Sequence, residues 1–447
     1  MNIDKQIAEK ILSYATALKA DSADVFLRSF NATSVEVKDQ KVDAFDRAKD
    51  TGAGLRVLSK GRLGFAFTTD LSDAALKALA LAAVTNAQNT EPDPYQSIPG
   101  KYQAPERPVA IHDPELVRLT EKEKIDRVMA MEREAFAADP RIKRIRKASA
   151  SFSESETVIL NTNGSEVAYK GTACSSSIEV VAEDKGESQA GSEFDVNRFY
   201  RKLLIEEVGR RAAQRALDLL GARHIDSVKA PVVLEATVAQ EFLSMLASGF
   251  SAESVQKKRS LFIGKLDTAV VSPMITVLDD GLLEGGLGTA PSDDETVPMK
   301  KKTIIEQGRL AMFLYNTYTA NKDKTTSTGN GMRGGFKGLP GVGSTNLYIE
   351  PGKSTLQELL AAAGRGLYIT EVMGMHTANP ISGDFSVGAT GFWIEKGRKA
   401  YPLREITIAG NILDLMKDVA VVGNDIRFSG RIGSPSLLIK ELSVGGK

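Results

Sequence analysis

The chain has few of the side chains that most often bind zinc. Its 447 residues include a single cysteine, Cys174, and three histidines, His112, His224 and His376. One cysteine excludes an internal disulfide and a zinc ribbon within the chain, and it is compatible with a reducing compartment. No His-Glu-x-x-His spacing occurs and the histidines lie far apart, so the sequence predicts no self-contained zinc protease site. The spacing of residues in the sequence also gives no support to a zinc site built from His376 and carboxylates.

The chain also lacks net charge and long apolar runs. Lys and Arg together number 57, as do Asp and Glu, so no excess of positive charge points to nucleic acid or an anionic membrane. The densest basic run, 141–147, is interrupted by Ile142 and Ile145, which is typical of the solvated edge of a strand or helix. No apolar run approaches the roughly 20 residues that span a bilayer, and the first residues do not resemble a signal peptide. We expect a cytoplasmic protein with no membrane and no direct nucleic-acid partner.

The length and composition predict an ordinary folded protein of two domains. The hydrophobic fraction is 42% and the charged fraction 26%. We place the domains at 1–222 and 223–447. In the first, an amphipathic helix opens the chain, a meander of short strands with a hairpin turn at 59–62 runs over 22–69, and a helix follows at 71–88.

The remainder of the first domain continues this alternation of helices and strands. Asp113 caps a second helical stretch, which continues through Thr120 and Glu123 in the relation of a capping box. A β segment with a hairpin at 163–164 comes next, and a strong helix stops at Gly221. The sequence therefore predicts an N-terminal α/β domain in which a β-meander is flanked by helices.

The second half is mostly β with two helices. The helices are predicted over 237–250 and 354–364, the latter capped by Ser354 with Gln357. Short strands separated by Gly-rich turns predict a closed or sandwiched antiparallel sheet. The strand candidates are 274–281, 309–316, 345–351, 366–372, 391–397, 404–410 and 435–444. The predicted fold class is α+β, with a C-terminal, mainly antiparallel β domain around a barrel-like core.

A Gly-rich segment, 329–345, has the composition of a phosphate-binding loop but not its context. Such loops need a strand before the glycines and a helix after them, whereas here a strand follows. No Lys-Ser or Lys-Thr pair closes the run. We interpret it as a flexible loop or lid, with nucleotide binding as the alternative, and the sequence does not determine whether the loop is ordered.

An acidic segment could supply oxygen ligands to a hard cation. It contains Asp279, Asp280, Asp293, Asp294 and Glu295. The spacing is not that of an EF-hand, and Asp-Asp-Gly is a common turn. An ordinary turn is the favoured interpretation.

Nucleophilic catalysis is also weakly supported. His376, Ser382, Asp384 and Ser386 could form a triad, since triads are recognised by geometry and not by order. No Gly-x-Ser-x-Gly elbow is present, however, and Ser and Asp are frequent in turns. Cys174 alternates like a strand residue, which favours a buried small apolar side chain over a nucleophile.

Several motifs, taken in order, resemble the TldD/PmbA family, also called modulators of DNA gyrase, and within it the PmbA (TldE) branch. No single motif is a catalytic signature, but their shared order is specific and spans nearly the whole chain. The motifs are EPDPY (91–95), VVLEATVAQEFLSMLASGFSAESVQKKRS (232–260), DDGLLEGGLGTAPSDDE (279–295), STGN (327–330), TNLYIEPG (345–352), HTANPISGDFSVGATGFWIE (376–395), IAGN (408–411) and VGNDIRF (422–428).

The resemblance implies a two-domain subunit, an N-terminal α/β domain and a C-terminal domain around a β-barrel-like core, in a dimer that encloses a cavity. In the known arrangement two unlike subunits pair as a metalloprotease that acts on unstructured peptides. The TldD-type subunit carries zinc on a His-Glu-x-x-x-His helix and a later cysteine. The PmbA-type subunit lacks these ligands.

This sequence departs from the zinc pattern at each position that the resemblance aligns. Ser244, Met245 and Gly249 stand where the first His, the Glu and the second His would be. The C-terminal half has no cysteine. We therefore assign no catalytic residue, no metal ligand and no cofactor to this chain, and expect zinc only in a TldD-type partner.

The leading hypothesis is a non-catalytic PmbA-type subunit that completes the peptide chamber of a TldD-type metalloprotease. The alternative is a homodimeric protein that binds a peptide or small ligand without proteolysis. A third option is a hydrolase that uses His376. Because the chain is neutral, the gyrase name has no physical support as direct DNA binding. The candidates for lining the peptide cleft are His376, Asn379, Ser382, Asp384 and Phe385.

Overall fold

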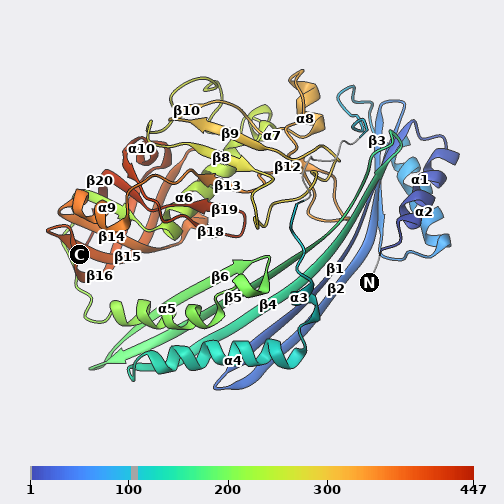
Figure 1. The fold of residues 1–447 in the computed structure, drawn as a ribbon. Coiled ribbons are helices and arrows are strands. Elements are labelled where there is room, and N and C mark those ends of the chain that lie inside the picture. The colour runs from blue at the N-terminus through green and yellow to red at the C-terminus, as the bar shows by residue number, and fades with distance from the viewer. Residues whose placement is uncertain (1–2, 102–108) are drawn as a thin grey trace.

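The computed structural model describes residues 3–101 and 109–447. The first half of the chain forms a long curved sheet with helices, and the second half forms a part centred on a barrel that lies against this sheet (Figure 1). The arrangement confirms the predicted α+β class and the barrel-like core of the second half. Within the described residues, no helix is both long and apolar enough to cross a membrane.

The N-terminal sheet is built from two consecutive antiparallel meanders. They are joined by the pairing of β1 with β4, so the strand order is β3-β2-β1-β4-β5-β6. The expectation of short strands is wrong, because β1 has 17 residues and β2 has 19, which corresponds to roughly 60 Å of extended chain. The strands are β1 (Ser22–Lys38), β2 (Lys41–Ser59), β3 (Arg62–Thr68), β4 (Ile142–Asn161), β5 (Glu166–Asp184) and β6 (Glu187–Asn197).

Both predicted hairpin turns of this sheet are confirmed. Lys60 and Gly61 join β2 to β3 with φ of +52° and +73°. Positive φ at both central residues is the geometry that matches the twist of a tight hairpin. Gly164, with φ of +87°, lies in the turn between β4 and β5.

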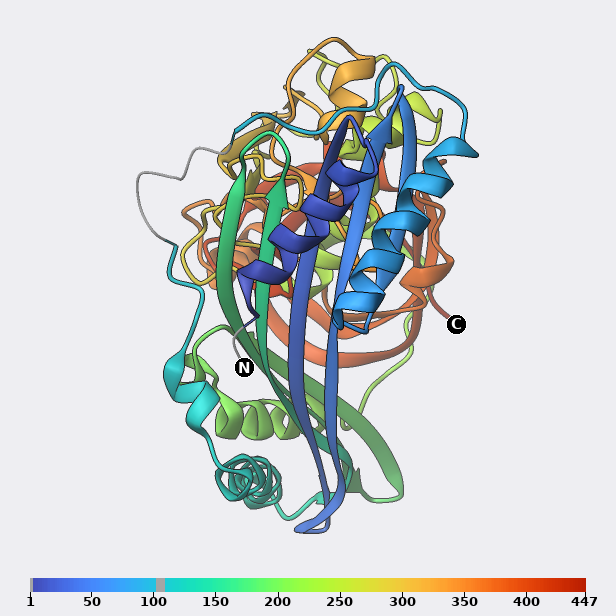
Figure 2. The same cartoon turned by 90° about the vertical axis from the view of Figure 1, so that its right-hand side faces the viewer.

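Helices cover one face of the sheet at its two ends (Figure 2). β1 supplies both apolar clusters with the same alternation: Val25 and Leu27 pack under one pair of helices, and Val35 and Val37 under the other. The first pair is α1 (Lys5–Ala17) and α2 (Asp73–Gln88), and the second end carries α3 (Pro114–Arg118), α4 (Glu121–Ala138), η1 (Tyr200–Lys202) and α5 (Ile205–Asp218).

The basic run 141–147 lies at the start of β4 and is a solvated strand edge, as interpreted. Ile142 and Ile145 point into the core. The charges between them form exposed ion pairs, Arg144 with Glu183 and Arg146 with Glu179.

One of the two predicted capping boxes is confirmed and the other is wrong. The Thr120 hydroxyl accepts the N–H of Glu123, and the Glu123 carboxylate accepts the N–H of Thr120, so this capping box is confirmed. It opens a new helix, since the extended backbone of Leu119 separates α3 from α4. The predicted box of Ser354 with Gln357 is wrong, because Thr355 and Glu358, one residue later and at the same spacing, form it.

Five antiparallel and parallel strand pairings close the barrel of the second half. The order β16-β15-β14-β7-β20 returns to its start through the pairing of β16 with β20, and β17 extends the sheet beside β20. The strands are β7 (Val228–Leu234), β14 (Gly366–Met373), β15 (Asp384–Glu395), β16 (Arg398–Asn411), β17 (Val419–Val422) and β20 (Leu437–Gly445).

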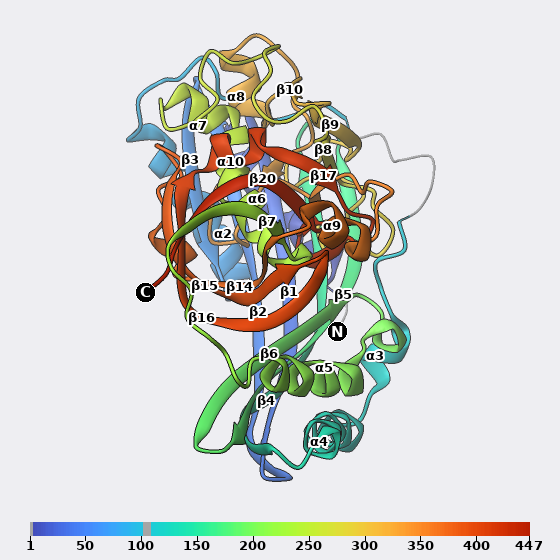
Figure 3. The same ribbon diagram turned by 90° about the vertical axis from the view of Figure 1, so that its left-hand side faces the viewer.

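The helix α6 (Ala236–Ala247) fills the barrel. Its Val238, Phe242 and Leu246 belong to the same apolar cluster as the inward residues of the barrel strands, and Figure 3 shows the ring of strands around it. The ring of Phe242 meets that of Phe385 edge-on, with centroids 5.0 Å apart. α9 (Leu356–Ala363) packs on the outside of the barrel, against a separate cluster.

A second sheet and several short elements connect the barrel to the N-terminal sheet. The predicted strand over 309–316 is wrong beyond its first two residues, which alone form β10. The sheet has the order β10-β9-β8-β13-β19-β18, and β11 pairs separately with β12. The elements are β8 (Val277–Asp280), β9 (Lys301–Glu306), β10 (Arg309–Leu310), β11 (Gly331–Met332), β12 (Gly341–Val342), β13 (Leu347–Ile349), β18 (Arg427–Ser429), β19 (Ile432–Ser434), η2 (Ser248–Phe250), α7 (Ala252–Gln256), α8 (Thr317–Lys322), η3 (Met375–Thr377) and α10 (Ile412–Lys417).

The domain boundary between residues 222 and 223 stays a prediction. α5, the last helix on the N-terminal sheet, ends at Asp218. The backbone of Arg223 already bonds to the barrel, with its N–H on the carbonyl of Pro402 at 2.9 Å.

A buried ion-pair network joins the two halves. Arg56 on β2 donates to Asp24 on β1 and, at 2.9 Å, to Glu295 of the second half. Arg333, also of the second half, donates to the other oxygen of Asp24 at 2.8 Å. Burial alone would raise the pKa of Asp24, but the charges of Arg56 and Arg333 outweigh it and hold that pKa below its ordinary value.

The Gly-rich segment, which we interpreted as a flexible loop or lid, takes part in this joint. Phe336 is buried against Phe26. A Cβ on Gly52 would lie 2.4 Å from the Phe336 ring, and one on Gly54 would lie 2.2 Å from the Phe336 carbonyl oxygen. Glycine in β2 therefore permits the close approach of the segment.

We predict that Arg56→Met strongly destabilises the protein. The change leaves Glu295 without its cation and Asp24 with only one, both in surroundings that exclude water. Removing one partner of a buried ion pair typically costs about 3 kcal/mol or more. The measurement is the shift of the denaturation midpoint in urea.

Arg201→Met is the matched control, because Arg201 forms an ion pair with Glu115 on the surface and exposed pairs contribute little. A midpoint shift for Arg56→Met no larger than that of Arg201→Met would contradict the central role of the network.

Candidate functional site

A surface hollow of about 390 Å³ lies beside α6, and it contains three of the predicted positions. Ser244 and Met245 of α6 and His376 of η3 line it together. Its other walls are two polar side chains and three apolar or small ones from the same two segments. They are Gln240 and Glu241 of α6 and Met375, Ala378 and Pro380 of the loop before β15.

Two of the predicted residues lie elsewhere. Phe385 was a candidate for lining the cleft, but it is buried in the barrel core against Phe242. Gly249 lies in η2, beyond the end of α6, where a Cβ would come within 3.1 Å of the Phe262 ring. Neither residue reaches the hollow.

Asn379, Ser382 and Asp384 shape the loop next to the hollow. The Asn379 side-chain oxygen accepts the N–H groups of Ile381 and Ser382, at 2.9 and 3.1 Å. Asp384 accepts from the amide of Asn411 at 3.0 Å, and this bond, with the one from Ser382, lowers its pKa. The three residues fix the turn rather than project into the hollow.

The proposed triad is not assembled. Within the described residues, no hydrogen bond links the His376 side chain to Ser382, Asp384 or Ser386. Asp384 instead bonds to Asn411.

The remaining histidines and the cysteine form no shared site. The rings of His112 and His224 lie beside Glu154 and Glu405, 3.0 and 3.9 Å away. Cys174 is buried, and burial, followed by nearby acidic charges, raises its pKa to about 12, so its thiol is not a ready nucleophile. Across residues 3–101 and 109–447, no three His, Cys, Asp or Glu side chains are gathered as a metal site.

The positions that would hold the family zinc do not fit a metal. Ser244 and Met245 offer a hydroxyl and a thioether, where zinc protein sites use His, Cys or carboxylate. α6 ends at Ala247, so Gly249 is no longer on the same helix as Ser244. We therefore derive no reaction step through a metal on this chain.

The acidic segment binds protein groups, with Asp279 and Asp280 at the end of β8 and the other three carboxylates in the loop beyond it. Asp279 pairs with Lys302 at 2.9 Å. Asp293 accepts three backbone N–H groups, and burial together with the charge of Glu295 raises its pKa. Asp280 caps the N–H of Leu282.

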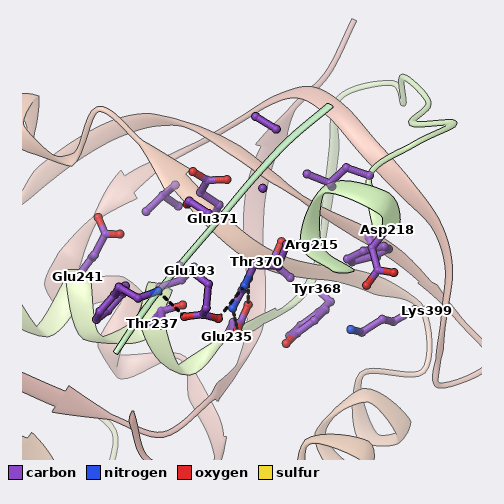
Figure 4. Close-up of a pocket in the computed structure, with 18 residues that line it drawn as sticks. Glu193, Arg215, Asp218, Glu235, Thr237, Glu241, Tyr368, Thr370, Glu371 and Lys399 are labelled. Atoms are coloured by element: carbon purple, nitrogen blue, oxygen red, sulfur yellow. Dashed lines mark hydrogen bonds and ion pairs between the residues drawn. The ribbon is translucent and has the colours of Figure 1, made fainter. Parts of the chain in front are cut away.

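A second hollow, of about 270 Å³, adjoins the first and lies where the two halves meet (Figure 4). Arg215 of α5 lies at its centre and pairs with Glu193 of β6 at 3.1 Å and Glu235 at 2.5 Å. Arg427 of β18 also pairs with Glu193, at 2.7 Å. These bonds link α5 and β6 to the barrel-centred part.

The second hollow is acidic overall. Its lining carries five carboxylates and two cations, Arg215 and Lys399. Burial lowers the pKa of Lys399, whose ammonium lies 4.5 Å from the centre of the Tyr368 ring. The excess of carboxylates therefore favours positively charged ligands.

Two carboxylates in this hollow lack a partner. Glu241 of α6 and Glu371 of β14 have no hydrogen bond or ion pair within the part of the chain that the structure describes, and Figure 4 shows them apart from the contacts of Arg215. Burial, and then the charge of Glu371, raise the pKa of Glu241. Glu241 lines both hollows, so the two lie side by side along α6, and we refer to them together as the cleft along α6.

The sequence offered a signal for Glu241 but none for the others. A helix over 237–250 places Glu241, Ser244 and Met245 at i, i+3 and i+4, on one face. Glu371 follows an irregularity in the pairing of β14 with β15, and Arg215 meets Glu235 only through the docking of the two halves. Neither Glu371 nor Arg215 can be identified as a site residue from the spacing of its neighbours in the sequence.

The fold and the cleft together define a class of protein. Its members combine a long antiparallel sheet with a helix-filled barrel and place a cleft along that helix. The chain belongs to the PmbA/TldA metallopeptidase family. The family's domain 1 matches residues 23–87, its central domain 114–220 and its C-terminal domain 227–446.

Similar proteins come from both branches of this family. The chain is 31% identical to "Metalloprotease PmbA" of Escherichia coli O157:H7, covering 99% of this chain and 97% of the relative. It is 27% identical to a "Metalloprotease TldD homolog" of Haemophilus influenzae, covering 100% and 97%.

Solved structures share the fold over their full length. A "putative modulator of a DNA gyrase" from Thermotoga maritima superposes with a TM-score of 0.91 at 30% identity, covering 99% of this chain and 100% of that one. TldE from Thermococcus kodakarensis gives a TM-score of 0.91 at 23% identity, covering 98% and 100%, and supports the fold alone.

We predict that Glu241→Gln stabilises the protein at neutral pH and not in acid. Because the folded-state pKa of Glu241 lies above the ordinary glutamate value of 4.5, the folded state holds a proton that the unfolded chain has released. Stability then falls as pH rises from that ordinary value through the folded pKa. The neutral glutamine removes this loss.

The measurement is the Tm of both proteins between pH 4 and pH 8. The variant's advantage should grow with pH, while Glu91→Gln, at an exposed glutamate, should follow the wild type. An advantage for Glu241→Gln that is equal at both ends of the range would contradict the prediction.

Proposed function

We propose that this chain is a PmbA-type, non-catalytic subunit of a TldD/TldE-type metalloprotease that degrades or processes unstructured peptides. The observation that carries the proposal is the cleft along α6, which is present while Ser244, Met245 and Gly249 replace the zinc ligands. In this role the chain completes the peptide chamber, and a TldD-type partner supplies the zinc.

The packing around Gly249 supports the assignment. Phe250 and Phe262 stack with ring centroids 4.9 Å apart, and the Phe262 ring lies directly against Gly249. A histidine at 249 would have to displace this buried pair. Position 249 therefore serves the packing of this chain, whereas the family's catalytic branch would have a zinc ligand there.

The chemistry of the cleft suits an extended peptide. The hollow beside Ser244 has Met245, Met375 and Pro380 for apolar side chains. Ile381 and Met373 are about half exposed nearby. The adjoining hollow offers the free carboxylates of Glu241 and Glu371 to a lysine, an arginine or an amino terminus.

The relatives point the same way. Identity to PmbA proteins, at 31% and 30% in two of them, exceeds the 27% and 26% to two TldD homologues over comparable lengths. Closing a chamber with a non-catalytic subunit still contributes to the reaction, since it orients an extended peptide and excludes folded proteins.

We predict that the chain alone neither carries stoichiometric zinc nor cleaves peptides, and that both properties appear with a TldD-type partner. The two chains are expressed separately and together, followed by light scattering on a sizing column, metal analysis and assays on an unfolded peptide. The complex should contain about one zinc ion, bound by the partner's ligands.

Two outcomes would contradict the proposal. Stoichiometric zinc in this chain alone, with peptide cleavage lost on chelation, would make it an enzyme in its own right. A stable homodimer that binds peptides and never associates with the TldD-type chain would favour the alternative of a peptide-binding protein.

We further predict that Met245→Arg raises the KM of the complex for peptides by about tenfold, because a charged side chain replaces an apolar one that lines the cleft. Zinc content and subunit pairing should not change. Met274→Arg, at a methionine that is 54% exposed outside the cleft, is the matched control and should leave KM unaltered. Equal effects of the two variants would argue against peptide contact at Met245.

A further inference from the structure

A separate cavity of about 370 Å³ lies between the N-terminal sheet and the barrel-centred part. It opens on the face of the sheet that carries no helices, and β1, β4 and β5 form its floor. Its lining holds four arginines and a single carboxylate, that of Asp294. The arginines are Arg28 of β1, Arg198 after β6, Arg333 after β11 and Arg431 between β18 and β19.

Two of these arginines are held firmly by the protein. Arg198 is buried and donates to the carbonyls of Gly286, Leu287 and Thr289, at 2.8, 2.8 and 2.9 Å. Arg333 donates to Asp24. Carbonyl oxygens satisfy the N–H groups of Arg198 without cancelling its charge.

The other two arginines have no such partner. Neither Arg28 nor Arg431 has a side-chain hydrogen bond or ion pair among the residues described. The Nε atom of Arg28 is moreover shielded from water without an acceptor. Buried donors are nearly always satisfied, so this atom indicates a missing acceptor in the cavity.

The charges act on one another across the cavity. Burial, followed by the charge of Arg431, lowers the pKa of Arg198 to about 10. Burial raises the pKa of Asp294 even though Arg333, Arg28 and Arg431 oppose the change. The single carboxylate therefore does not balance the arginines, and like charges from both halves of the chain face each other.

We propose that this cavity binds an oxyanion, a carboxylate or a phosphate group, between Arg28 and Arg431. Guanidinium groups match both anions with paired hydrogen bonds. Because Arg28 belongs to the N-terminal sheet and Arg431 to the barrel-centred part, the anion would bridge the two halves. The site is distinct from the acidic cleft along α6 and does not depend on the function proposed for that cleft.

The test uses the full chain in chloride buffer and measures binding by calorimetry with two kinds of probe. One is inorganic phosphate. The other is a pair of short peptides of the same sequence, one with a free C-terminal carboxylate and one amidated. Binding of phosphate alone identifies a phosphate source, and preference for the free carboxylate over the amide identifies a peptide terminus. Either result supports the site.

Arg28→Gln and Arg431→Gln should each weaken binding of the probe by about tenfold or more. Arg431 is exposed at the rim, so its replacement keeps the fold even if that of Arg28 does not. Arg398→Gln, which removes an equal charge from the exposed start of β16, is the control and should bind as the wild type does.

Two results would overturn the proposal. One is the absence of saturable binding of both probe types to the wild type up to about 10 mM, an affinity too weak to be specific. The other is a loss of binding in Arg398→Gln as large as that in Arg431→Gln, which would mean that net charge and not the cavity attracts the anion.

Discussion

The way the acidic and Gly-rich segments of the second half meet the N-terminal sheet depends on the buried contacts of Arg56. A buried ion pair adds little net stability over an apolar contact of the same size, but its hydrogen bonds are directional. Arg56 and Asp24 lie on neighbouring strands, and they hold Glu295 and Arg333 of the second half. These bonds set the place of the acidic and Gly-rich segments on the sheet, whereas an apolar joint would allow them to slide.

That joint leaves two hollows of opposite charge between the halves. On one side Arg215 is fully engaged by Glu193 and Glu235, and the cleft that remains is acidic. On the other side Arg198 is bound only by carbonyls, and the cavity stays basic. Both hollows have walls from each half, so a ligand in either hollow would contact both halves of the chain.

The sequence predicted what is local and missed what the docking of the halves creates. The turns at Gly61 and Gly164 and the Thr120 capping box depend on neighbours within four residues, and each was correct. The length of β1 was not predicted, because its polar positions resemble turns until they are placed on a solvated sheet face. Phe385 resembled a loop residue and is core, since only the presence of α6 inside the barrel buries it. The partners of Arg56 and Arg215 are far away in sequence, and no spacing rule finds them.

The two faces of α6 are under different structural constraints. Val238, Phe242 and Leu246 point into the barrel, and the closed sheet constrains their size. Ser244 is exposed at the cleft, and Met245 lines the cleft while it packs only in part against the barrel core. Substitutions on the cleft face therefore cost little folding energy, and beyond α6 the Phe262 ring packs directly against Gly249. The helix keeps its structural role in the barrel, and the chemistry of its outer face is free to change.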